Sequence, residues 1–129
     1  MTEGIEAITT AALGLALDAA SLRQQAIASN IANADTVGYE PLSVNFETQL
    51  EEARFAMQSQ GRLDATSLAG VVPRLEIDRS YRSFGLSPKV LLDVEVAHMA
   101  QNAVHYQALI RGLSRHFAIM SSAVSDGKK

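Results

Sequence analysis

The sequence predicts a mainly α-helical fold, in which long N- and C-terminal helices pack as a coiled coil beside a small irregular central segment. Alanine and aliphatic residues dominate both ends of the 129-residue chain, whereas Pro41, Pro73 and Pro88 all lie in the middle. Both ends also repeat apolar residues at helical spacing. We therefore treat residues 1–129 as a single unit with an N-terminal helix (1–36), a central segment (37–92) and a C-terminal helix (93–129).

A heptad pattern predicts the N-terminal helix. Its seam follows alternating steps of four and three residues through Ile8, Ala12, Leu15, Ala19, Leu22, Ala26, Ser29 and Asn33. A second apolar line runs through Leu13, Leu17, Ala20, Ile27 and Ile31, so more than one side of this helix can be covered. Gly38 can take a positive φ in the turn that follows. We place the helix near residues 5–33.

The central segment gives weaker signals for a short helix and short β-strands. Asn45 is a candidate N-cap for a helix whose apolar face is Phe46, Leu50, Ala53 and Met57. Charged and apolar residues alternate over 74–78, which predicts a short strand or extended segment. Residues 58–70 show neither pattern, and we expect them to be mobile.

The C-terminal helix carries the strongest pattern in the sequence. Apolar residues alternate at steps of three and four over four heptads, through Val96, Met99, Ala103, Tyr106, Ile110, Leu113, Phe117, Met120 and Val124. Asp93 is a candidate N-cap, with Glu95 in the first turn, although Ser87 followed by Pro88 offers an earlier start. We place the helix near residues 93–124.

Both predicted helices are sparsely charged. Between Ala7 and Ala34 the charged side chains are Asp18 and Arg23, and between Val96 and Val124 they are Arg111 and Arg115. A lone amphipathic helix normally shows a charged side opposite its apolar stripe. We therefore expect neighbouring subunits to cover these helices, and an isolated chain to have poorly ordered ends that become helical on association.

Composition argues against several classes of function. The chain has 11 basic and 14 acidic residues, so it offers no bulk positive field for nucleic acid. It lacks Cys, and its three histidines, His98, His105 and His116, form no i, i+4 metal-binding pair. Neither a nucleophile elbow nor a phosphate-binding loop is present. The sequence thus predicts no catalytic residues, no metal and no cofactor.

The N-terminus does not resemble a secretory signal peptide. Its first basic residue is Arg23, and Glu3 and Glu6 stand where such a signal is positive. The best apolar run, Ala7–Ala20, is shorter than the roughly 20 residues that a membrane span needs. We expect neither a cleaved signal nor a direct membrane span.

Asn30 and Asn33, near the end of the N-terminal helix, have two interpretations. Asn can satisfy the free carbonyls at a helix end. Alternatively, a buried amide at a packed seam fixes register, because a wrong pairing leaves it without hydrogen bonds. The two interpretations are compatible.

Two segments of the sequence resemble the bacterial flagellar rod and hook proteins. Residues 29–39, SNIANADTVGY, resemble the family's N-terminal signature, an Asn-rich helix end followed by a Gly-Tyr turn. Residues 93–117, DVEVAHMAQNAVHYQALIRGLSRHF, resemble the C-terminal helix of the family's proximal rod member. Val37 stands where the family usually has Pro, and residues 83–89 replace its usual Gly-Asn-Asn stretch. Both departures concern local turns.

The resemblance implies a structural, non-enzymatic part of the flagellar basal body. It implies a proximal rod subunit of the periplasmic drive shaft, which transmits torque from the inner-membrane ring to the distal rod, hook and filament. Its implied partners are copies of itself, other rod proteins, the ring-to-rod adaptor, and inner-membrane ring or export-gate components. Type III export without a cleaved signal peptide is also implied. Two alternatives remain: another basal-body rod or adaptor component, and a non-flagellar helical dimerisation module.

We expect the assembly interface to combine both helical seams with the Asn-rich turn. The expected residues are Ile8, Leu15, Leu22, Asn30, Asn33, Gly38, Tyr39, Val96, Met99, Asn102, Tyr106, Ile110, Leu113, Phe117 and Met120.

Overall fold

The computed structural model describes residues 2–61, 65–81, 85 and 87–128. The elements follow in the order α1 (Thr2–Ala32), β1 (Leu42–Asn45), α2 (Glu47–Gln60), the 3₁₀ turn η1 (Ala65–Leu68), β2 (Arg74–Ile77) and α4 (Pro88–Asp126). Two long terminal helices and a small central segment with a short helix and strands confirm the predicted fold class.

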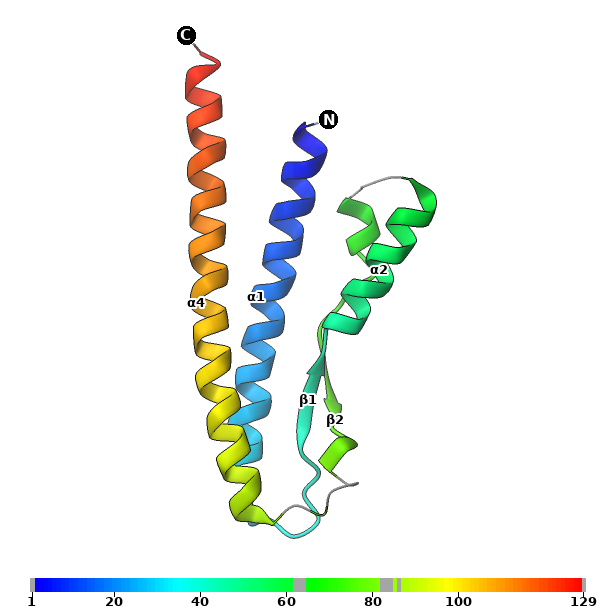
Figure 1. The fold of residues 1–129 in the computed structure, drawn as a ribbon, viewed down its shortest axis with the longest axis vertical. Coiled ribbons are helices and arrows are strands. Elements are labelled where there is room, and N and C mark those ends of the chain that lie inside the picture. Colours follow the sequence, from blue (N-terminus) through cyan, green and yellow to red (C-terminus); the bar gives the residue numbers. More distant parts are fainter. Residues whose placement is uncertain (1, 62–64, 82–84, 86, 129) are drawn as a thin grey trace.

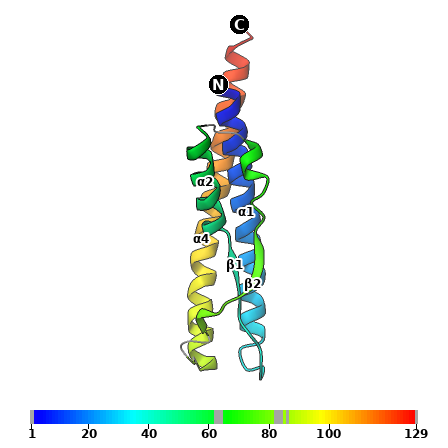
Figure 2. The ribbon, with the colours of Figure 1, turned by 90° about the vertical axis from the view of Figure 1, so that its right-hand side faces the viewer.

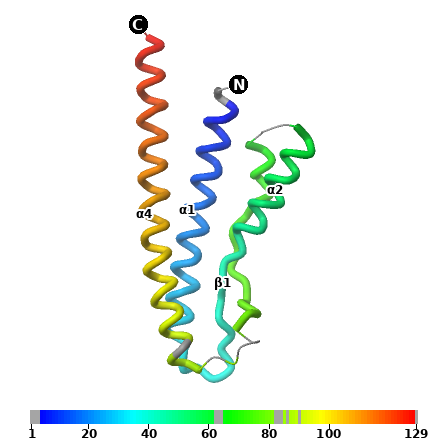
Figure 3. Tube along the Cα trace, in the orientation of Figure 1, coloured from blue at the N-terminus to red at the C-terminus, as the bar shows by residue number. Residues whose placement is uncertain are grey.

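The molecule is elongated, and α1 lies in its middle. Figure 1 shows α4 along one side of α1, with the two strands and α2 along the other. Seen after a quarter turn, the same elements form a narrow rod (Figure 2). At about 1.5 Å per residue, α1 is about 46 Å long and α4 about 58 Å. Both termini lie at one end, where α4 extends beyond α1 (Figure 3).

The C-terminal helix starts earlier than Asp93. It begins at Pro88, with Ser87 in the N-cap position in an extended conformation (φ −69°, ψ 155°). Proline suits the first helical position because its missing N–H has no intrahelical partner there and its fixed φ is already helical. Asp93 therefore lies within α4, and the Ser-Pro start was the correct alternative.

The two strands form an antiparallel pair beside α1. Leu42 pairs with Ile77 and Val44 with Leu75, which confirms the extended segment predicted at 74–78. Asn45 is the last residue of β1, and Phe46 takes the N-cap position of α2 without a side-chain hydrogen bond. The predicted Asn45 cap is thus wrong, because pairing with Arg74 holds Asn45 in the strand.

The segment expected to be mobile contains ordered structure. Residues 58–60 complete α2, and Gly61 ends it in a left-handed conformation, with φ at 64°. Residues 65–68 form η1, whose Leu68 is buried. A buried leucine fixes this turn against the rest of the chain. Residues 62–64, which share the same expectation, lie outside the described residues.

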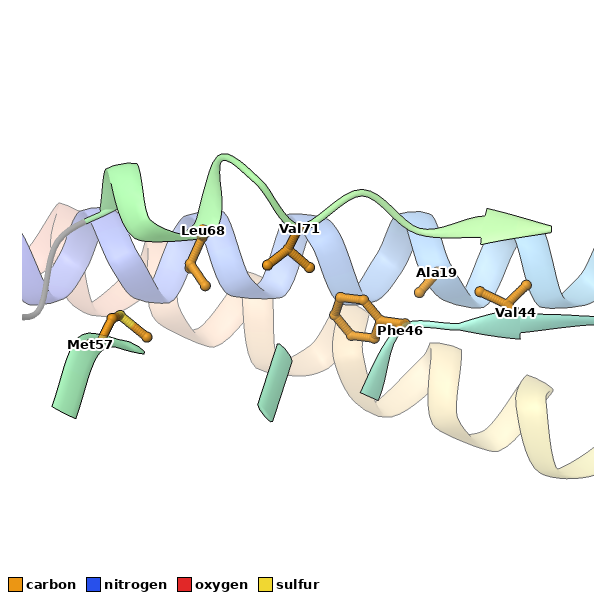
Figure 4. Packing of buried hydrophobic residues seen from close by; sticks show 6 residues of the cluster. All are labelled: Ala19, Val44, Phe46, Met57, Leu68 and Val71. Carbon is orange, nitrogen blue, oxygen red and sulfur yellow. The ribbon is translucent and has the colours of Figure 1, made fainter. Parts of the chain in front are cut away.

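The hydrophobic core lies between α1 and the central segment rather than between the two long helices. Figure 4 shows six buried members of this cluster, to which α1, β1, α2 and η1 all contribute: Ala19, Val44, Phe46, Met57, Leu68 and Val71. Partly buried residues of the predicted α1 seam pack against them, namely Ile8, Ala12, Leu15 and Leu22. The α1 seam therefore packs within its own chain, which the heptad pattern alone could not specify.

The apolar character of α1 extends further than the Ala7–Ala20 run. Residues 4–32 are long and apolar enough, by length and composition alone, to cross a membrane. In the structure the helix is flanked by α4 and by the central segment (Figure 1). Contacts on two sides require apolar residues around much of a helix. Packing within the protein thus accounts for part of the composition of α1, many of whose residues are only partly buried.

Candidate assembly interface

Asn30, at the end of α1, connects the helix to the first strand. Its Nδ2 donates to the Leu42 carbonyl at 2.9 Å, and its Oδ1 accepts from the Leu42 N–H at 2.8 Å. The Tyr39 hydroxyl donates to the same Oδ1 at 2.9 Å. Only 1% of Asn30 is exposed. A buried amide with these partners selects one register of β1 on α1, because any slip would leave it unsatisfied.

The turn between α1 and β1 is held by neighbouring polar residues. Ser29 Oγ lies 2.9 Å from the Tyr39 hydroxyl, and Asn33 Nδ2 donates to the Ser29 carbonyl at 2.9 Å. Gly38 has a φ of +79°, the left-handed region that glycine adopts most easily. Asn33 therefore satisfies a helix-end carbonyl and Asn30 fixes register. All four predicted turn residues serve the chain's own fold.

The two long helices contact each other through α4 positions that differ from most of the predicted seam. The more buried α4 residues that recur at helical spacing are Leu91, Glu95, Asn102, Leu109, Leu113, His116 and Met120. Asn102 Nδ2 donates to the Ala20 carbonyl at 3.0 Å, and Thr10 Oγ1 lies 3.2 Å from His116 Nε2. Ala20 belongs to the second apolar line of α1. This line therefore faces α4 where Asn102 binds it.

Most of the predicted α4 seam is exposed in the single chain. We call five of its exposed large residues the α4 stripe: Val96, Met99, Tyr106, Ile110 and Phe117. Val96 is 51% exposed and Phe117 48%. Leu113 and Met120 are instead partly buried. The sequence thus correctly predicted a line of apolar residues on this helix, and within one chain much of that line is exposed to solvent.

The position of the α4 stripe follows from helix geometry. At 3.6 residues per turn, Val96, Ile110 and Phe117 lie about 60 to 120° around the helix from Asn102, which faces α1. His98, Gln101 and His105 lie on the opposite side of Asn102, where they line a pocket with residues of the central segment. The α4 stripe therefore lies on the side of the helix pair away from that pocket.

Sequence reasoning missed a polar cluster near the start of α4. Glu95 is only 2% exposed, and its Oε1 accepts a hydrogen bond of 2.7 Å from the Tyr81 hydroxyl. His98 Nδ1 lies 3.7 Å from the same oxygen. Glu95 Oε2 is buried and has no hydrogen-bond partner among the described residues. Nothing in the sequence indicated that Glu95 is buried. Its predicted place, in the first turn of a helix that begins at Asp93, is one where a carboxylate is normally exposed to water.

The cluster changes the acidity of its tyrosine. Burial, together with the hydrogen bond to the Glu95 carboxylate and its negative charge, raises the pKa of Tyr81. An ionised phenolate beside a carboxylate would be repelled and poorly solvated. Tyr81 therefore remains a hydrogen-bond donor to Glu95 throughout the neutral range.

The described part of the chain shows no grouping of three or more side chains that could hold a metal ion. His116 contacts Thr10, His98 lies near Glu95, and His105 lines the pocket described above. These three positions are spread along α4 and do not converge on a common point. Their environments are those of packing and surface residues.

Comparison with known proteins finds relatives of one kind. A family model described as "Flagella basal body rod protein" matches residues 12–39. The flagellar basal body rod protein FlgB of Bacillus subtilis (strain 168) is 30% identical over 124 residues, which cover 88% of this chain and 90% of that protein. FlgB of Proteus mirabilis (strain HI4320) is 28% identical over 127 residues, covering 87% and 90%. FlgB of Escherichia coli (strain K12) is 27% identical over 130 residues, covering 87% and 89%. No solved structure matches the chain.

Proposed function

The chain belongs to the flagellar basal body rod protein family, and from this membership we propose how it is built into the rod. It is a structural component of the basal body, a proximal rod subunit, rather than an enzyme. It assembles with other flagellar rod components. The question is which surfaces make that assembly.

We propose that copies of the chain pack through the α4 stripe. The exposed apolar surface of Val96, Met99, Tyr106, Ile110 and Phe117 is the observation that carries this proposal. Monomeric soluble proteins rarely leave a large contiguous apolar patch in water, and such patches commonly mark protein–protein contacts. Burying these side chains against a neighbouring helix would complete the coiled-coil packing that the heptad pattern predicts.

The shape of the subunit suits a drive shaft. The pair of α1 and α4 runs along the length of the molecule (Figure 1). Helices that are locked side by side along an axis resist bending and twisting better than loops, because every turn is both hydrogen-bonded and packed. The apolar side chains of α1 are held between α4 and the central segment. The α4 stripe is then the side of this shaft left for neighbours.

We also propose the location and the outer partners of the subunit. As a proximal rod subunit it would lie in the periplasm and contact the ring-to-rod adaptor, the inner-membrane ring or the export gate. We propose, too, that it is exported through the flagellar type III apparatus without a cleaved signal peptide. A direct membrane span is not needed for this role.

A charge substitution on the α4 stripe tests the proposed packing. We expect Phe117→Asp to abolish swimming in a strain that lacks the wild-type chain and to leave purified basal bodies without the variant. A carboxylate in an apolar contact would have no partner there. Ala108→Asp, an exposed position on the other side of the same helix, is the matched control. Equal incorporation of the two variants would contradict the proposal.

A stable closed dimer would instead favour the non-flagellar dimerisation module. Sedimentation of the purified chain distinguishes the two cases. A rod subunit should be monomeric when dilute and should associate with further copies or rod proteins, whereas the module should remain a dimer at all accessible concentrations. A dimer combined with normal flagella in a deletion strain would exclude the rod function.

A further inference from the structure

A pocket of about 410 Å³ lies between α1, the strands and the first half of α4. Three carboxylates line it, those of Glu47, Asp78 and Glu95, together with the guanidinium of Arg23. Arg23 is already engaged, since its Nη2 binds the Glu47 carboxylate. The remaining charge of the lining is therefore negative.

Glu95 gives the pocket an unsatisfied acceptor. The side chain is almost fully buried, and Tyr81 occupies only one of its two oxygens. The other, Oε2, has no hydrogen-bond partner among the described residues. A buried carboxylate is costly unless it is paired and hydrogen-bonded. Glu95 Oε2 therefore needs a further hydrogen-bond donor, most favourably a cation. The half-exposed side chain of His98 lies at the solvent side of this carboxylate.

The described chain offers two free cations of suitable kind on the distal half of α4. Arg111 and Arg115 are the charged side chains of the segment between Val96 and Val124. Both are exposed, and neither forms an ion pair with a described residue. At about 1.5 Å per residue they lie about 24 and 30 Å along the helix from Glu95, which is too far to reach it within one chain. These positive side chains can therefore contact the negatively charged pocket only if the pocket belongs to another copy of the chain.

We propose that the Glu95 pocket receives the guanidinium of Arg111 or Arg115 from a second copy of this chain. This inference rests on the proposed rod function and adds a specific contact to it. In a rod whose copies repeat along an axis, this contact would be heterologous: each copy gives an arginine to one neighbour and accepts one from another, whereas a reciprocal exchange would close a dimer. The pairing sets an axial stagger of about 24 to 30 Å between copies.

Disulfide cross-linking tests the proposed neighbourhood without altering the charges. The chain has no cysteine, so Gln101→Cys beside the pocket and Ala118→Cys, which shares a helix face with Arg111 and Arg115, can be placed on separate, co-expressed copies. We expect mild oxidation of purified basal bodies to give a disulfide-linked pair of the two variants. Gln101→Cys with Gln58→Cys, an exposed position at the end of α2, should give none. No Gln101–Ala118 product in basal bodies that contain both copies would overturn the inference.

A charge cycle tests the pairing itself. Glu95→Gln keeps the acceptor for Tyr81 and removes the charge, whereas Arg111→Gln with Arg115→Gln removes the proposed donors. We expect each change to lower the amount of chain in basal bodies about tenfold, and the combination to be no worse, because both remove one interaction. Glu76→Gln, an exposed carboxylate on β2, is the control and should have no effect. Additive losses would overturn the inference.

The two proposals fail in different ways. Wild-type basal bodies that lack this chain would refute the rod function and this inference with it. Basal bodies that contain the chain, respond to Phe117→Asp and yet give no cross-link would refute the arginine contact alone. If Glu95→Gln unfolds the purified chain by circular dichroism, the cross-link in the background with native charges decides the matter.

Discussion

The side-chain amide of Asn30 and the backbone of Leu42 bind each other at two points, as adjacent strands do. Asn30 Nδ2 donates to the Leu42 carbonyl at 2.9 Å, and the Leu42 N–H donates to Asn30 Oδ1 at 2.8 Å. Through this pair the end of α1 serves as a template for β1. Asn30 therefore fixes the position of Leu42, the first residue of β1, against the end of α1.

Replacing Asn30 by Ala should destabilise the fold by about 2 to 4 kcal/mol, because it breaks three hydrogen bonds and leaves the Leu42 groups without partners. Thermal unfolding followed by circular dichroism at a fixed protein concentration measures the loss. Asn33→Ala, which removes one hydrogen bond at a helix end, should cost about 1 kcal/mol or less. Equal effects of the two substitutions would contradict the role assigned to Asn30.

Gly38 and Gly14 should respond in opposite directions to alanine. Gly38 has a positive φ, where a Cβ is strained, so Gly38→Ala should destabilise by about 1 kcal/mol. Gly14 lies within α1, and a Cβ there would meet no atom within 4 Å. Gly14→Ala should therefore stabilise the chain by about 0.5 to 1 kcal/mol. Chemical denaturation of the two variants measures both changes, and a stabilising Gly38→Ala would refute the turn geometry.

The protein should lose stability at alkaline pH through Tyr81. Its pKa in the folded chain is raised above the ordinary value of 10.0. Below that value both the folded and the unfolded chain keep the proton, and the contribution to stability is complete. Above it the unfolded chain releases the proton first, so stability falls as the pH rises.

Melting temperatures between pH 9 and pH 11 test this dependence. Tyr81→Phe should flatten the alkaline decline, whereas Tyr106→Phe, at an exposed position of the α4 stripe, should leave it unchanged. The neutral-pH melting temperature of Tyr81→Phe should fall, because Glu95 loses its donor. A decline as steep as that of the wild type would exclude Tyr81 as its source.

Helix content should depend on protein concentration. The α4 stripe and the sparse charge of both long helices leave the single chain with apolar surface that association would cover. We expect the far-ultraviolet circular dichroism signal per residue to grow as the chain is concentrated or mixed with rod proteins. Full helicity and a concentration-independent melting transition in dilute solution would contradict coupled ordering.

Local chemistry made several features predictable. The heptads identified both long helices, and the alternation at 74–78 marked β2. The start of the C-terminal helix was predicted at Asp93, and the Ser87-Pro88 pair, given as the alternative, marks its true start. The central strand β1 was harder to foresee. Its four residues are too few to show a clear alternating pattern. The strand is held by pairing with β2, which is distant in the sequence, and by Asn30, which belongs to α1.

The candidate site was only partly predictable. The sequence located the apolar residues of the α4 stripe, but it also assigned Ile8, Leu15 and Leu22 to assembly, whereas these pack in the chain's own core. It gave no sign of the buried Glu95. A carboxylate near a helix start is usually solvated, and only the approach of Tyr81 and α1 removes Glu95 from water.

By itself, then, the sequence determined which segments are helical and roughly where they begin and end. It also showed that the two long helices carry more apolar surface than a helix exposed to water normally does. The tertiary structure decided which face of each helix is used within the chain. Periodicity could not decide it, because alanine-rich helices with few charges are apolar on several faces and no local preference ranks them. That ranking comes from contacts between distant segments, such as Asn102 with Ala20 and Phe46 with the core around Ala19.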